Sequence, residues 1–550
     1  MATKKNKRKI AVIDFETDPF LHGRIPKPFA WGFYDGEKYV EHWESNAWEN
    51  NNCVKVLTDF LEATEEPHLI LAHNGGKFDF IFFIEKLTGN IRIVNGRILQ
   101  AQIGNHTLRD SYAILPIPLS AAGGKKEIDY KLMEREVREG HKAEIMSYLK
   151  TDCVSLHELV LAFYNEFGDN LTIGSAAMKQ LKKFHTFETA GESFDRQFRK
   201  FYFGGRCQCF ETGVIDMPVK GYDLNSSYPF TMRSMMHPVS VDHMSVGRVS
   251  NKTSFVAWEG ENFNAMPTRE KVGLNFNVPY GVFNSTIHEF NMGLETGTIK
   301  VNKVHEAINF TQRLDFSDFV EHFYLARIKA KAEKNIFLDL FYKLILNSSY
   351  GKFAQSPEKF IDSIILPYDV FPPNLYVKIN GVDALRKEQY EMMHENDGYK
   401  IWGKPSGVRT YYNVATAASI TGGSRATLLK GLSQATRPLY CDTDSIYCLD
   451  LAADLSDKKL GAWKHEFTGS QIAIAGKKLY AVMGKKINKE TGLLEYGCLK
   501  KASKGTLLNP MAIFMIARGD TCETQNDAPA FKLDGKHQFI RRNISRTGKM

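Results

Sequence analysis

An apolar run that ends in two carboxylates most constrains how this chain can begin to fold. Residues 10–13 are apolar and mostly β-branched, which predicts a buried strand, and Asp14-Phe15-Glu16 follows at once. Residues two apart in a strand face the same side, so Asp14 and Glu16 can converge on one ion. Taken alone, a D-x-E strand is more often an exposed strand face, so the interpretation depends on what the rest of the chain supplies.

Two further acidic segments occur in the same N-terminal region. Asn74-Gly-Gly-Lys-Phe78-Asp79 follows an apolar run at residues 70–72, and residues 78–87 resemble the start of a helix. Residues 135–167 read as mostly helical, and within them a spacing of four puts Tyr148 and Asp152 on one helix face. The alternation of strand, turn and helix predicts an α/β domain up to about residue 170.

Four carboxylates around one point repel one another strongly unless cations neutralise them. Two-metal phosphoryl chemistry has this requirement, because paired Mg²⁺ ions about 3.5–4 Å apart activate a water and stabilise the leaving oxygen. Tyr148 is then placed to hold the attacking water. Each segment has an ordinary alternative, since Asp79 can cap the helix that follows it and a lone Y-x-x-x-D is usually a plain helix face. The occurrence of all three segments in one α/β unit favours the metal centre.

A second acidic group lies further along the chain. Gly221-Tyr-Asp223 leads through a turn to Tyr228-Pro229, and the segment Tyr440-Cys-Asp442-Thr-Asp444 is expected at a turn between two short strands. Asp442 and Asp444 have a spacing suited to metal ligation. A D-T-D-S segment at a hairpin is usually a polar turn, so this segment alone does not decide between the two interpretations.

A predicted helix between these two segments carries basic and polar residues on one side. Residues 322–348 have helical spacing, and Lys343, Asn347 and Tyr350 share a face, to which Arg327 and Lys331 add positive charge. A cationic stripe that faces a metal-binding carboxylate pair is what a nucleoside triphosphate needs. A basic helix is usually a solvated face, but the three segments together favour the functional interpretation.

The composition limits the class of protein without identifying it. A chain of 550 residues is too long for one compact core, so several domains are expected. The 71 basic against 63 acidic residues suit a polyanionic partner, although a merely soluble basic surface explains them as well. Eight scattered cysteines without metal-site spacing indicate a reducing compartment, and no apolar run of about 18 residues predicts a membrane span.

In this order, the segments resemble the motifs of family-B DNA polymerases, in particular those of the protein-primed bacteriophage branch. The amino-acid sequence around these motifs is most similar to that of the tectivirus-type enzymes. The three N-terminal segments resemble the exonuclease motifs. D-L-N-S-S-Y-P, K-L-I-L-N-S-S-Y-G and Y-C-D-T-D-S resemble polymerase motifs A, B and C, although motif A usually has a leucine where this chain has Ser227. Further matches are Lys125-Lys-Glu-Ile128 for an extra exonuclease lysine motif, Tyr202-Phe-Gly204-Gly205 for the interdomain link, and Lys478-Leu-Tyr480 for a primer-contacting K-x-Y motif.

The resemblance implies an α/β and α+β multidomain fold, with an RNase-H-like exonuclease domain followed by a right-hand palm, fingers and thumb. Residues 322–350 are expected to supply much of the fingers, residues 355–410 look irregular, and residues 413–435 look helical. The expected domains are the exonuclease at 1–190, a linker at 191–210, palm and fingers at 211–505 with insertions near 238–320 and 356–410, and a thumb-like region at 506–550.

The resemblance also implies roles for single residues. Asp223 and Asp444 are expected to bind two Mg²⁺, for which Mn²⁺ can substitute, with Asp442 close by and Lys343 beside the triphosphate. The implied nucleotide-binding residues are Tyr228, which rejects a ribose 2′-OH, Tyr350, Arg327 and Asn347. The implied exonuclease residues are the metal ligands Asp14, Glu16, Asp79 and Asp152, the catalytic Tyr148 and Lys125, and the strand-binding Asn74 and Phe78. The remaining implied DNA contacts are Tyr202, Gly204, Gly205, Lys478 and Tyr480.

The partners implied by the resemblance are a DNA primer–template, dNTPs and a terminal protein as primer, in the cytoplasm of a bacterial host and without a membrane. Two other functions fit parts of the chain. A metal-dependent 3′–5′ nuclease with a DNA-binding but non-polymerising second half would need Asp223 or Asp444 to be absent or misplaced. A non-enzymatic replication or packaging factor would leave the carboxylates of both groups unexplained.

Overall fold

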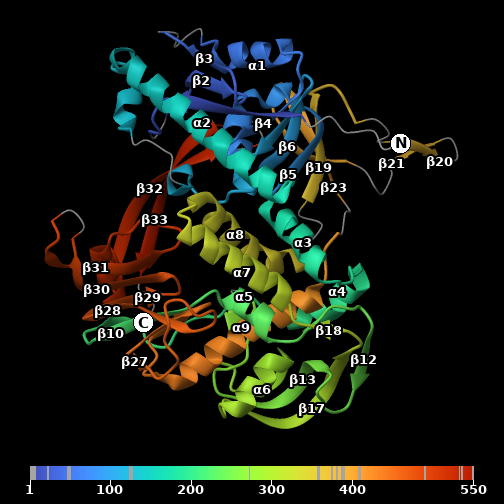
Figure 1. Ribbon diagram of the computed structural model, residues 1–550, viewed down its shortest axis with the longest axis vertical. Coiled ribbons are helices and arrows are strands. Elements are labelled where there is room, and N and C mark those ends of the chain that lie inside the picture. Colours follow the sequence, from blue (N-terminus) through green and yellow to red (C-terminus); the bar gives the residue numbers. More distant parts are fainter. Residues whose placement is uncertain are drawn as a thin grey trace.

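The computed structural model describes residues 8–21, 24–45, 51–122, 128–271, 273–355, 360–372, 376–379, 382–385, 390–406, 410–488, 491–531, 533 and 537–547. A large sheet built mainly from the N-terminal part of the chain lies at one end of the molecule, and a smaller antiparallel sheet lies toward the other end, with two long helices, α7 and α8, between them (Figure 1). None of the helices in the described ranges is long and apolar enough to cross a membrane.

The strand predicted at residues 10–13 is confirmed as an internal strand of the large sheet. β1 (Lys9–Thr17) pairs in parallel with β4 (His68–Ala72) and antiparallel with β2 (Pro28–Tyr34). Val12 packs in the core that contains α2, whereas Ile13 packs in the core that contains α1, and neither has exposed surface. An apolar run with both faces covered is typical of a central strand between helix layers.

The other elements of this N-terminal unit follow in chain order. They are β3 (Tyr39–Trp43), α1 (Cys53–Ala63), the 3-10 helices η1 (Gly75–Lys77) and η2 (Asp79–Lys86), β5 (Thr88–Val94), β6 (Arg97–Ile103), β7 (His106–Asp110), η3 (Ser111–Ala113), η4 (Leu119–Ala122), η5 (Tyr130–Met133), η6 (Arg138–His141), α2 (Lys142–Phe167), α3 (Ile173–Phe184), α4 (Glu192–Phe198) and η7 (Arg199–Phe201). The predicted helix at residues 78–87 is therefore a 3-10 helix, which kinks at Phe83. The helix predicted from residue 135 begins as the long α-helix only at Lys142.

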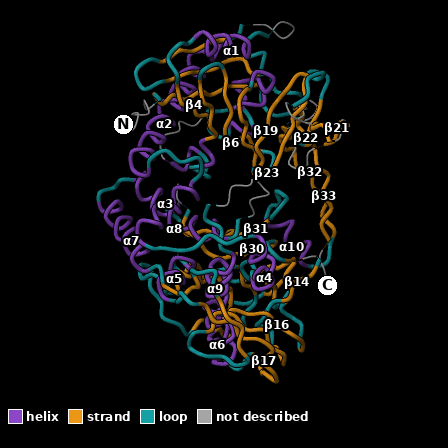
Figure 2. The backbone as a smooth tube through the Cα atoms, turned by 90° about the vertical axis from the view of Figure 1, so that its right-hand side faces the viewer, coloured by secondary structure: helices purple, strands orange, loops and turns teal. Residues whose placement is uncertain are grey.

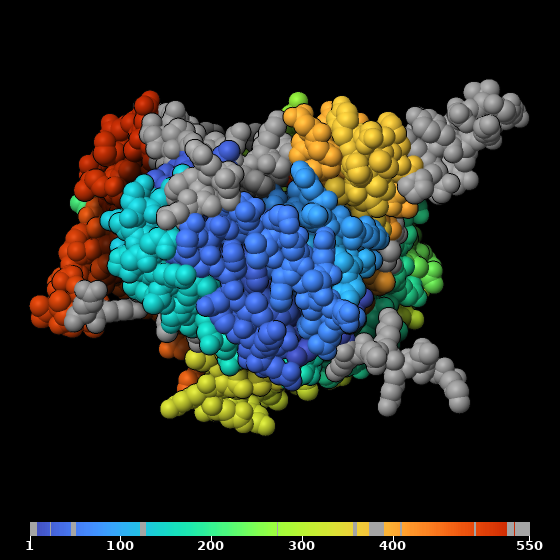
Figure 3. Space-filling model, turned by 90° about the horizontal axis from the view of Figure 1, so that it is seen from above, coloured from blue at the N-terminus to red at the C-terminus, as the bar shows by residue number. Residues whose placement is uncertain are grey.

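Residues 355–410, predicted to be irregular, instead extend the N-terminal sheet, so that prediction was wrong. β19 (Phe360–Pro367) pairs with β5, β23 (Tyr399–Pro405) pairs with β19, and β22 (Glu391–Glu395) closes the edge. Seen from above, this segment lies beside the N-terminal residues (Figure 3). Pro, Gly and Asn residues separate these strands, and β19 forms by pairing with β5, which is far away in the sequence. A local sequence pattern does not predict such a strand. A separate hairpin joins β20 (Tyr376–Ile379) and β21 (Val382–Leu385).

The smaller sheet has five antiparallel strands in the order β28-β10-β26-β25-β8, which fits the expected palm. Its helices are α5 (Ser227–Ser234) and α9 (Val414–Gln434), and the helix predicted at residues 413–435 is thus confirmed. The strands are β8 (Cys207–Cys209), β10 (Val219–Leu224), β25 (Tyr440–Asp442), β26 (Ser445–Cys448) and β28 (Trp463–Gly469), with the short pair β24 (Ala435–Thr436) and β27 (Asp450–Leu451) beside them.

The helical region predicted at residues 322–348 forms two antiparallel helices, α7 (Ser317–Ala332) and α8 (Ile336–Phe353). The break has a local cause, because Lys334 has a φ of 56° and the side chain of Asn335 caps α8 by accepting from the amide of Leu338 at 3.0 Å. Periodicity alone continued through the break because both helices expose basic residues.

Most of residues 238–320 form a separate unit, whose elements α6, β16 and β17 lie at the end of the molecule away from α1 (Figure 2). Its four-stranded sheet has the order β12-β17-β13-β16, and one helix covers it. The elements are β11 (His237–Pro238), β12 (His243–Val246), β13 (Thr253–Asn262), β14 (Thr268–Glu270), β15 (Gly273–Asn275), β16 (Tyr280–Thr286), α6 (Ile287–Glu295), β17 (Ile299–Phe310) and β18 (Arg313–Leu314).

The C-terminal unit begins before residue 506, where a thumb-like region was expected. Its sheet has the order β31-β30-β29-β9, so its strands start near Gln471 and include one from the linker side. A C-terminal hairpin reaches back to the insertion, where the hydroxyl of Tyr399 donates to the carbonyl of Leu533 at 2.9 Å. The elements are β9 (Gly213–Ile215), β29 (Gln471–Gly476), β30 (Leu479–Ile487), β31 (Leu494–Ser503), α10 (Pro510–Ala517), β32 (Thr521–Phe531) and β33 (His537–Thr547).

If the inserted strands are part of the N-terminal unit, a cavity in β23 should weaken β1. Ile401→Ala removes a fully buried side chain from the core that contains Ala11 and Ile13, and should cost about 2–4 kcal/mol of unfolding free energy. Native-state hydrogen exchange should show faster exchange of the β1 amides. The matched control is Met392→Ala on the neighbouring β22, whose side chain is 49 % exposed. Equal β1 protection in both variants would contradict the shared core.

Candidate active sites

Strand pairing brings two predicted carboxylates together in the five-stranded sheet. Asp223 on β10 lies opposite Ser445 on β26, directly after the turn that contains Asp444. The amide of Leu224 donates to the carbonyl of Asp444 at 2.7 Å, and the amide of Asp444 donates to the carbonyl of Asp442 at 2.7 Å. The register of two strands therefore fixes the separation of Asp223 and Asp444.

The charges of these two carboxylates oppose each other in a partly buried place. Burial, followed by the charge of Asp444, raises the pKa of Asp223 to about 7. Burial, followed by the charge of Asp442, raises the pKa of Asp444 to about 6. Such a group is costly to ionise by itself and favours a bound cation.

Asp442 has a different environment from its two neighbours. It forms an ion pair with the ammonium group of Lys478, and the hydroxyl of Tyr440 donates to its Oδ2 at 3.3 Å. Lys478 was expected to contact the primer, and the structure places it beside the carboxylates. Tyr480 was expected to contact DNA too, but its side chain is only 6 % exposed and its hydroxyl lies 2.8 Å from that of Tyr447. We therefore correct that assignment: Tyr480 supports the sheet beneath Lys478.

The linker between the two units packs on the catalytic turn. Thr443 has a φ of 60°, in the left-handed region that is unfavourable for a β-branched residue, and its amide donates to the carbonyl of Arg206 at 2.6 Å. A Cβ on Gly205 would lie 2.6 Å from the Oγ1 of Thr443, so only glycine fits there. Gly204 is exposed, and Tyr202 is half-buried with its carbonyl accepting from Arg269 at 2.6 Å. The expected DNA contacts of this linker thus sit against the turn.

Two tyrosines from different helices form a stacked pair near this site. The rings of Tyr228 on α5 and Tyr350 on α8 have centroids 3.9 Å apart and an interplanar angle of 19°. Ser227, which replaces the usual leucine of motif A, is buried, and its hydroxyl lies 2.8 Å from that of Ser424 on α9. A hydrogen bond therefore takes the place of apolar packing beside Tyr228.

The basic stripe divides into two kinds of residue. Lys343 and Asn347 are exposed on α8, where they are accessible to a ligand. Arg327 instead bonds to Asp339 across the helix pair, with Nε 2.7 Å from Oδ1, so its guanidinium is already engaged by a carboxylate. This bond joins α7 to α8, and the contact of Arg327 with a triphosphate stays a prediction.

One acidic residue near the aspartates was missed by the sequence analysis. Glu466 on β28 raises the pKa of both Asp223 and Asp444 by its charge, and its carboxylate is 3.0 Å from the ammonium group of Lys500 on β31. The segment around Glu466 has no motif or spacing that signals it, because it reaches the site only through the pairing of β28 with β10.

The four N-terminal carboxylates also converge. They come from β1 (Asp14 and Glu16), the first residue of η2 (Asp79) and the long helix α2 (Asp152). The thiol of Cys153, fully buried beside them, has its pKa raised by burial and then by the charges of all four carboxylates. Because the charges of all four carboxylates act on this one side chain, the three predicted segments lie close to one another.

Asp79 is the most deeply buried of these four carboxylates. It is 1 % exposed, and neither carboxylate oxygen has a partner in hydrogen-bonding geometry among the described residues. Burial, and then the charge of Asp14, raises its pKa well above the ordinary value, while the amides of Asp79 and Phe15 offset this only in part. A buried carboxylate with open lone pairs beside another carboxylate suits a divalent cation.

Neither group of carboxylates forms a complete metal-binding site by itself in the described residues. Across the described ranges, no three histidine, cysteine, aspartate or glutamate side chains stand ready to hold a metal ion. Carboxylate oxygens are nonetheless the ligands that Mg²⁺ prefers, and Mg²⁺ usually takes only one or two of them together with substrate oxygens. The donor sets therefore fit metal ions that bind together with a phosphodiester.

Tyr148 and two aromatic residues complete the N-terminal group. The hydroxyl of Tyr148 lies 3.3 Å from that of Tyr130, and its pKa is raised by burial, by this contact and by the charges of Asp152 and Glu16. Tyr148 is therefore a neutral donor. The ring of Phe78 packs edge-on against Phe20 at 5.8 Å, and Phe20, which the sequence analysis did not identify, is 41 % exposed.

The glycine turn before Asp79 is required by close packing. Asn74 has a φ of 66°, which starts the turn, and a Cβ on Gly76 would lie 1.9 Å from the carbonyl oxygen of Ile98. Asp79 follows this turn and lies near enough to Asp14 on β1 for the charge of Asp14 to raise its pKa. Lys125, predicted to assist catalysis, lies outside the described residues.

The fold and the paired aspartates at the turn of an antiparallel sheet define a nucleotidyl-transferring polymerase. A family model described as DNA polymerase type B, organellar and viral, matches residues 124–378. The chain is 47 % identical over 574 residues to the DNA-directed DNA polymerase of Enterobacteria phage PRD1, covering 99 % of each chain. It is 25 % identical over 428 residues to the DNA polymerase of Bacillus phage phi29, covering 68 % of this chain and 67 % of that one.

Among solved structures, phi29 DNA polymerase complexed with primer-template DNA superimposes with a TM-score of 0.72 at 19 % identity, over 99 % of this chain and 100 % of that chain. This likeness shows the fold, an exonuclease domain combined with palm, fingers and thumb. The chain belongs to the family-B DNA polymerases of the viral type, and it is a DNA-directed DNA polymerase.

The raised pKa of Asp223 predicts how pH affects the metal-free protein. The folded-state value of about 7 lies above the value near 4 of an unfolded chain, so the stability that protonation confers is lost as pH rises through 7. Asp223→Asn should therefore stabilise the metal-free protein at pH 8 by about 1–2 kcal/mol, after screening by solvent. Thermal unfolding in EDTA should show this gain at pH 8 and little gain below pH 5. A gain that does not depend on pH would contradict the explanation.

Proposed function

We propose that this polymerase replicates a phage genome, edits its product at the N-terminal carboxylate group, and begins synthesis on a protein primer. The observation that carries the proposal is the presence of two separate groups of mutually repelling carboxylates in one chain. One group lies in the palm and the other in the exonuclease-type domain, and each combines hard oxygen ligands with a neighbouring aromatic residue.

In the palm, Asp223 and Asp444 would hold two Mg²⁺. Bound there, the ions neutralise the triphosphate and lower the pKa of the attacking hydroxyl. Asp442 and Lys478 keep the turn and the neighbouring hairpin in a fixed relation. The role assigned to Tyr228, which stacks on Tyr350, is to exclude a ribose 2′-OH. The role assigned to Lys343, which is exposed on α8, is to favour the phosphates of the incoming deoxynucleotide.

In the N-terminal group, Asp14, Glu16, Asp79 and Asp152 would hold the metal ions that supply charge for phosphodiester hydrolysis. Tyr148 donates its hydroxyl proton to orient the attacking water, because its raised pKa keeps it neutral. Phe78, together with Phe20, offers ring surfaces on which the bases of a single-stranded 3′ end can stack.

Protein priming and the site of action rest on the family resemblance. Sheets form near residues 238–320 and 356–410, where the resemblance to the protein-primed branch implies two insertions. The phage relatives support action in the cytoplasm of a bacterial host. A nuclease with a non-polymerising second half is disfavoured, because Asp223 and Asp444 are both present and adjacent.

The editing proposal predicts separable activities. Asp14→Ala combined with Glu16→Ala should slow 3′ shortening of a 5′-labelled primer on the order of 10³-fold or more, because the metal ligands are lost. Extension of the same primer with dNTPs should persist. The reciprocal variant, Asp444→Ala, should lose extension and keep shortening. Loss of both activities in either variant, with an unchanged melting temperature, would count against two independent centres.

The priming proposal predicts a covalent product that contains no DNA primer. Purified enzyme, the terminal protein of the same genome, Mg²⁺ and each labelled dNTP in turn should give a terminal protein–dNMP adduct, in which a protein oxygen replaces pyrophosphate on the α-phosphate. The adduct should be visible by denaturing gel and absent with Asp444→Ala. An enzyme that extends a DNA primer but never labels the terminal protein would refute protein priming while leaving the polymerase assignment intact.

A further inference from the structure

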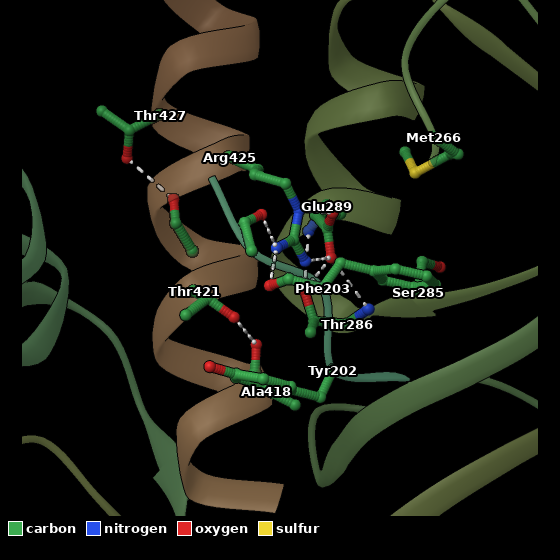
Figure 4. A network of polar contacts seen from close by, with 12 residues as sticks. Tyr202, Phe203, Met266, Ser285, Thr286, Glu289, Ala418, Thr421, Arg425 and Thr427 are labelled. Atoms are coloured by element: carbon green, nitrogen blue, oxygen red, sulfur yellow. Dashed lines mark hydrogen bonds and ion pairs between the residues drawn. The ribbon is translucent and has the colours of Figure 1, made fainter. Parts of the chain in front are cut away.

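A buried ion pair joins the 238–320 insertion to the long helix α9. Arg425 on α9 and Glu289 on α6 are each 3 % exposed. Nε and Nη2 of Arg425 donate to the two carboxylate oxygens of Glu289 at 2.7 and 3.0 Å (Figure 4). A paired fork of this kind fixes orientation as well as charge, and lysine cannot reproduce it.

The same guanidinium also holds the linker. Nη1 of Arg425 donates to the carbonyl of Phe203 at 2.5 Å and to that of Gly204 at 2.8 Å. Figure 4 shows Arg425 between Glu289 on one side and the linker on the other. Glu289 accepts from two of the three N–H groups that remain, so it sets the angle at which the guanidinium meets the linker carbonyls.

The linker carries this constraint to the catalytic turn. Gly205, next to the clamped carbonyl of Gly204, packs against the side chain of Thr443, and the carbonyl of Arg206 accepts from the amide of Thr443 at 2.6 Å. Asp444 follows Thr443 directly. A continuous series of contacts thus runs from Glu289 to Asp444. The carboxylate of Glu289 binds the guanidinium of Arg425, the guanidinium binds the linker carbonyls, and the linker contacts the turn that carries Asp444.

Glu289 is itself held rigidly. It forms a capping box with Thr286 at the start of α6, and both side chains press against α9 at Gly422, where a Cβ would lie 2.3 Å from the Oγ1 of Thr286. Arg425 also lies near enough to Tyr228 for its charge to oppose the raised pKa of that residue. No catalytic step described above uses Glu289, and its fixed position is otherwise unexplained.

We propose that Glu289 is a positioning residue of the polymerase centre: through Arg425 and the linker it fixes the turn that carries Asp444. The inserted unit then contributes to catalysis without touching the substrate. The proposal rests on the assignment of Asp223 and Asp444 as the polymerase centre.

Pre-steady-state incorporation of one dNTP on a DNA primer–template separates positioning from folding, since the burst amplitude reports the active fraction and the burst rate reports the chemistry of active molecules. Glu289→Gln keeps the size and the capping ability of the side chain but removes the charge that aligns Arg425. Its burst rate should fall about tenfold or more, because a small displacement of a catalytic group lowers the rate of the chemical step strongly. Glu289→Asp, which keeps the charge, should recover part of the rate.

The matched control is Asn413→Ala, which removes the side chain that caps the start of α9. The Asn413 side chain bonds to Thr416 and Glu188 and to neither member of the carboxylate–guanidinium pair. This variant should lower the melting temperature and the burst amplitude while leaving the burst rate within about twofold of wild type. A wild-type burst rate in Glu289→Gln, or equal rates in Glu289→Gln and Asn413→Ala, would overturn the proposal. A wild-type enzyme that shows no burst dependent on Asp444 would instead refute the assignment of the polymerase centre.

Discussion

The repulsion between Asp223 and Asp444 is the constraint to which most of the surrounding structure responds. Burial raises the pKa of Asp223 to about 7 and that of Asp444 to about 6, so it is costly to ionise both groups together. Strand register keeps the two groups near each other, since Asp223 and the turn belong to paired strands. In the N-terminal group, Asp79 follows a tight turn in which Gly76 leaves no space for a side chain.

Thr443 is a β-branched residue at positive φ, so its turn is stable only with contacts from other parts of the chain. These contacts explain why Arg425 and Glu289 are buried nearby. Thr443 is held by the carbonyl of Arg206, and the linker is held in turn by Arg425. An unpaired buried guanidinium is costly, so Glu289 must be buried with it. A strained loop at one catalytic residue thus accounts for an ion pair between two elements that are far apart in the sequence.

The sequence predicts well what local pattern and spacing determine. The strand at β1, the helix α9 and the two acidic groups followed from apolar periodicity and from carboxylate spacing. What it could not predict depended on distant pairing. The strands of the 356–410 insertion take their place only at the edge offered by β5, and Glu466 reaches the aspartates only through β28. The partners of Arg327 and Tyr480, which are Asp339 and Tyr447, could not be predicted for the same reason, because the motifs do not specify them.

The path of the chain also limits how the two carboxylate groups can cooperate. The chain leaves the N-terminal sheet at the linker, returns to it with β19, leaves again through α9, and returns at the C-terminal hairpin, where Leu533 is buried against the N-terminal core. Moving the N-terminal unit against the palm would open the shared core in which Phe163 and Phe167 of α2 pack against Phe341 of α8. Arg425 also fixes the linker, so, if the N-terminal group edits as proposed, a freed DNA 3′ end would move between two fixed centres. Phe20, 41 % exposed, and the half-buried Phe78 against which it packs would then offer ring surface to a strand that arrives unpaired.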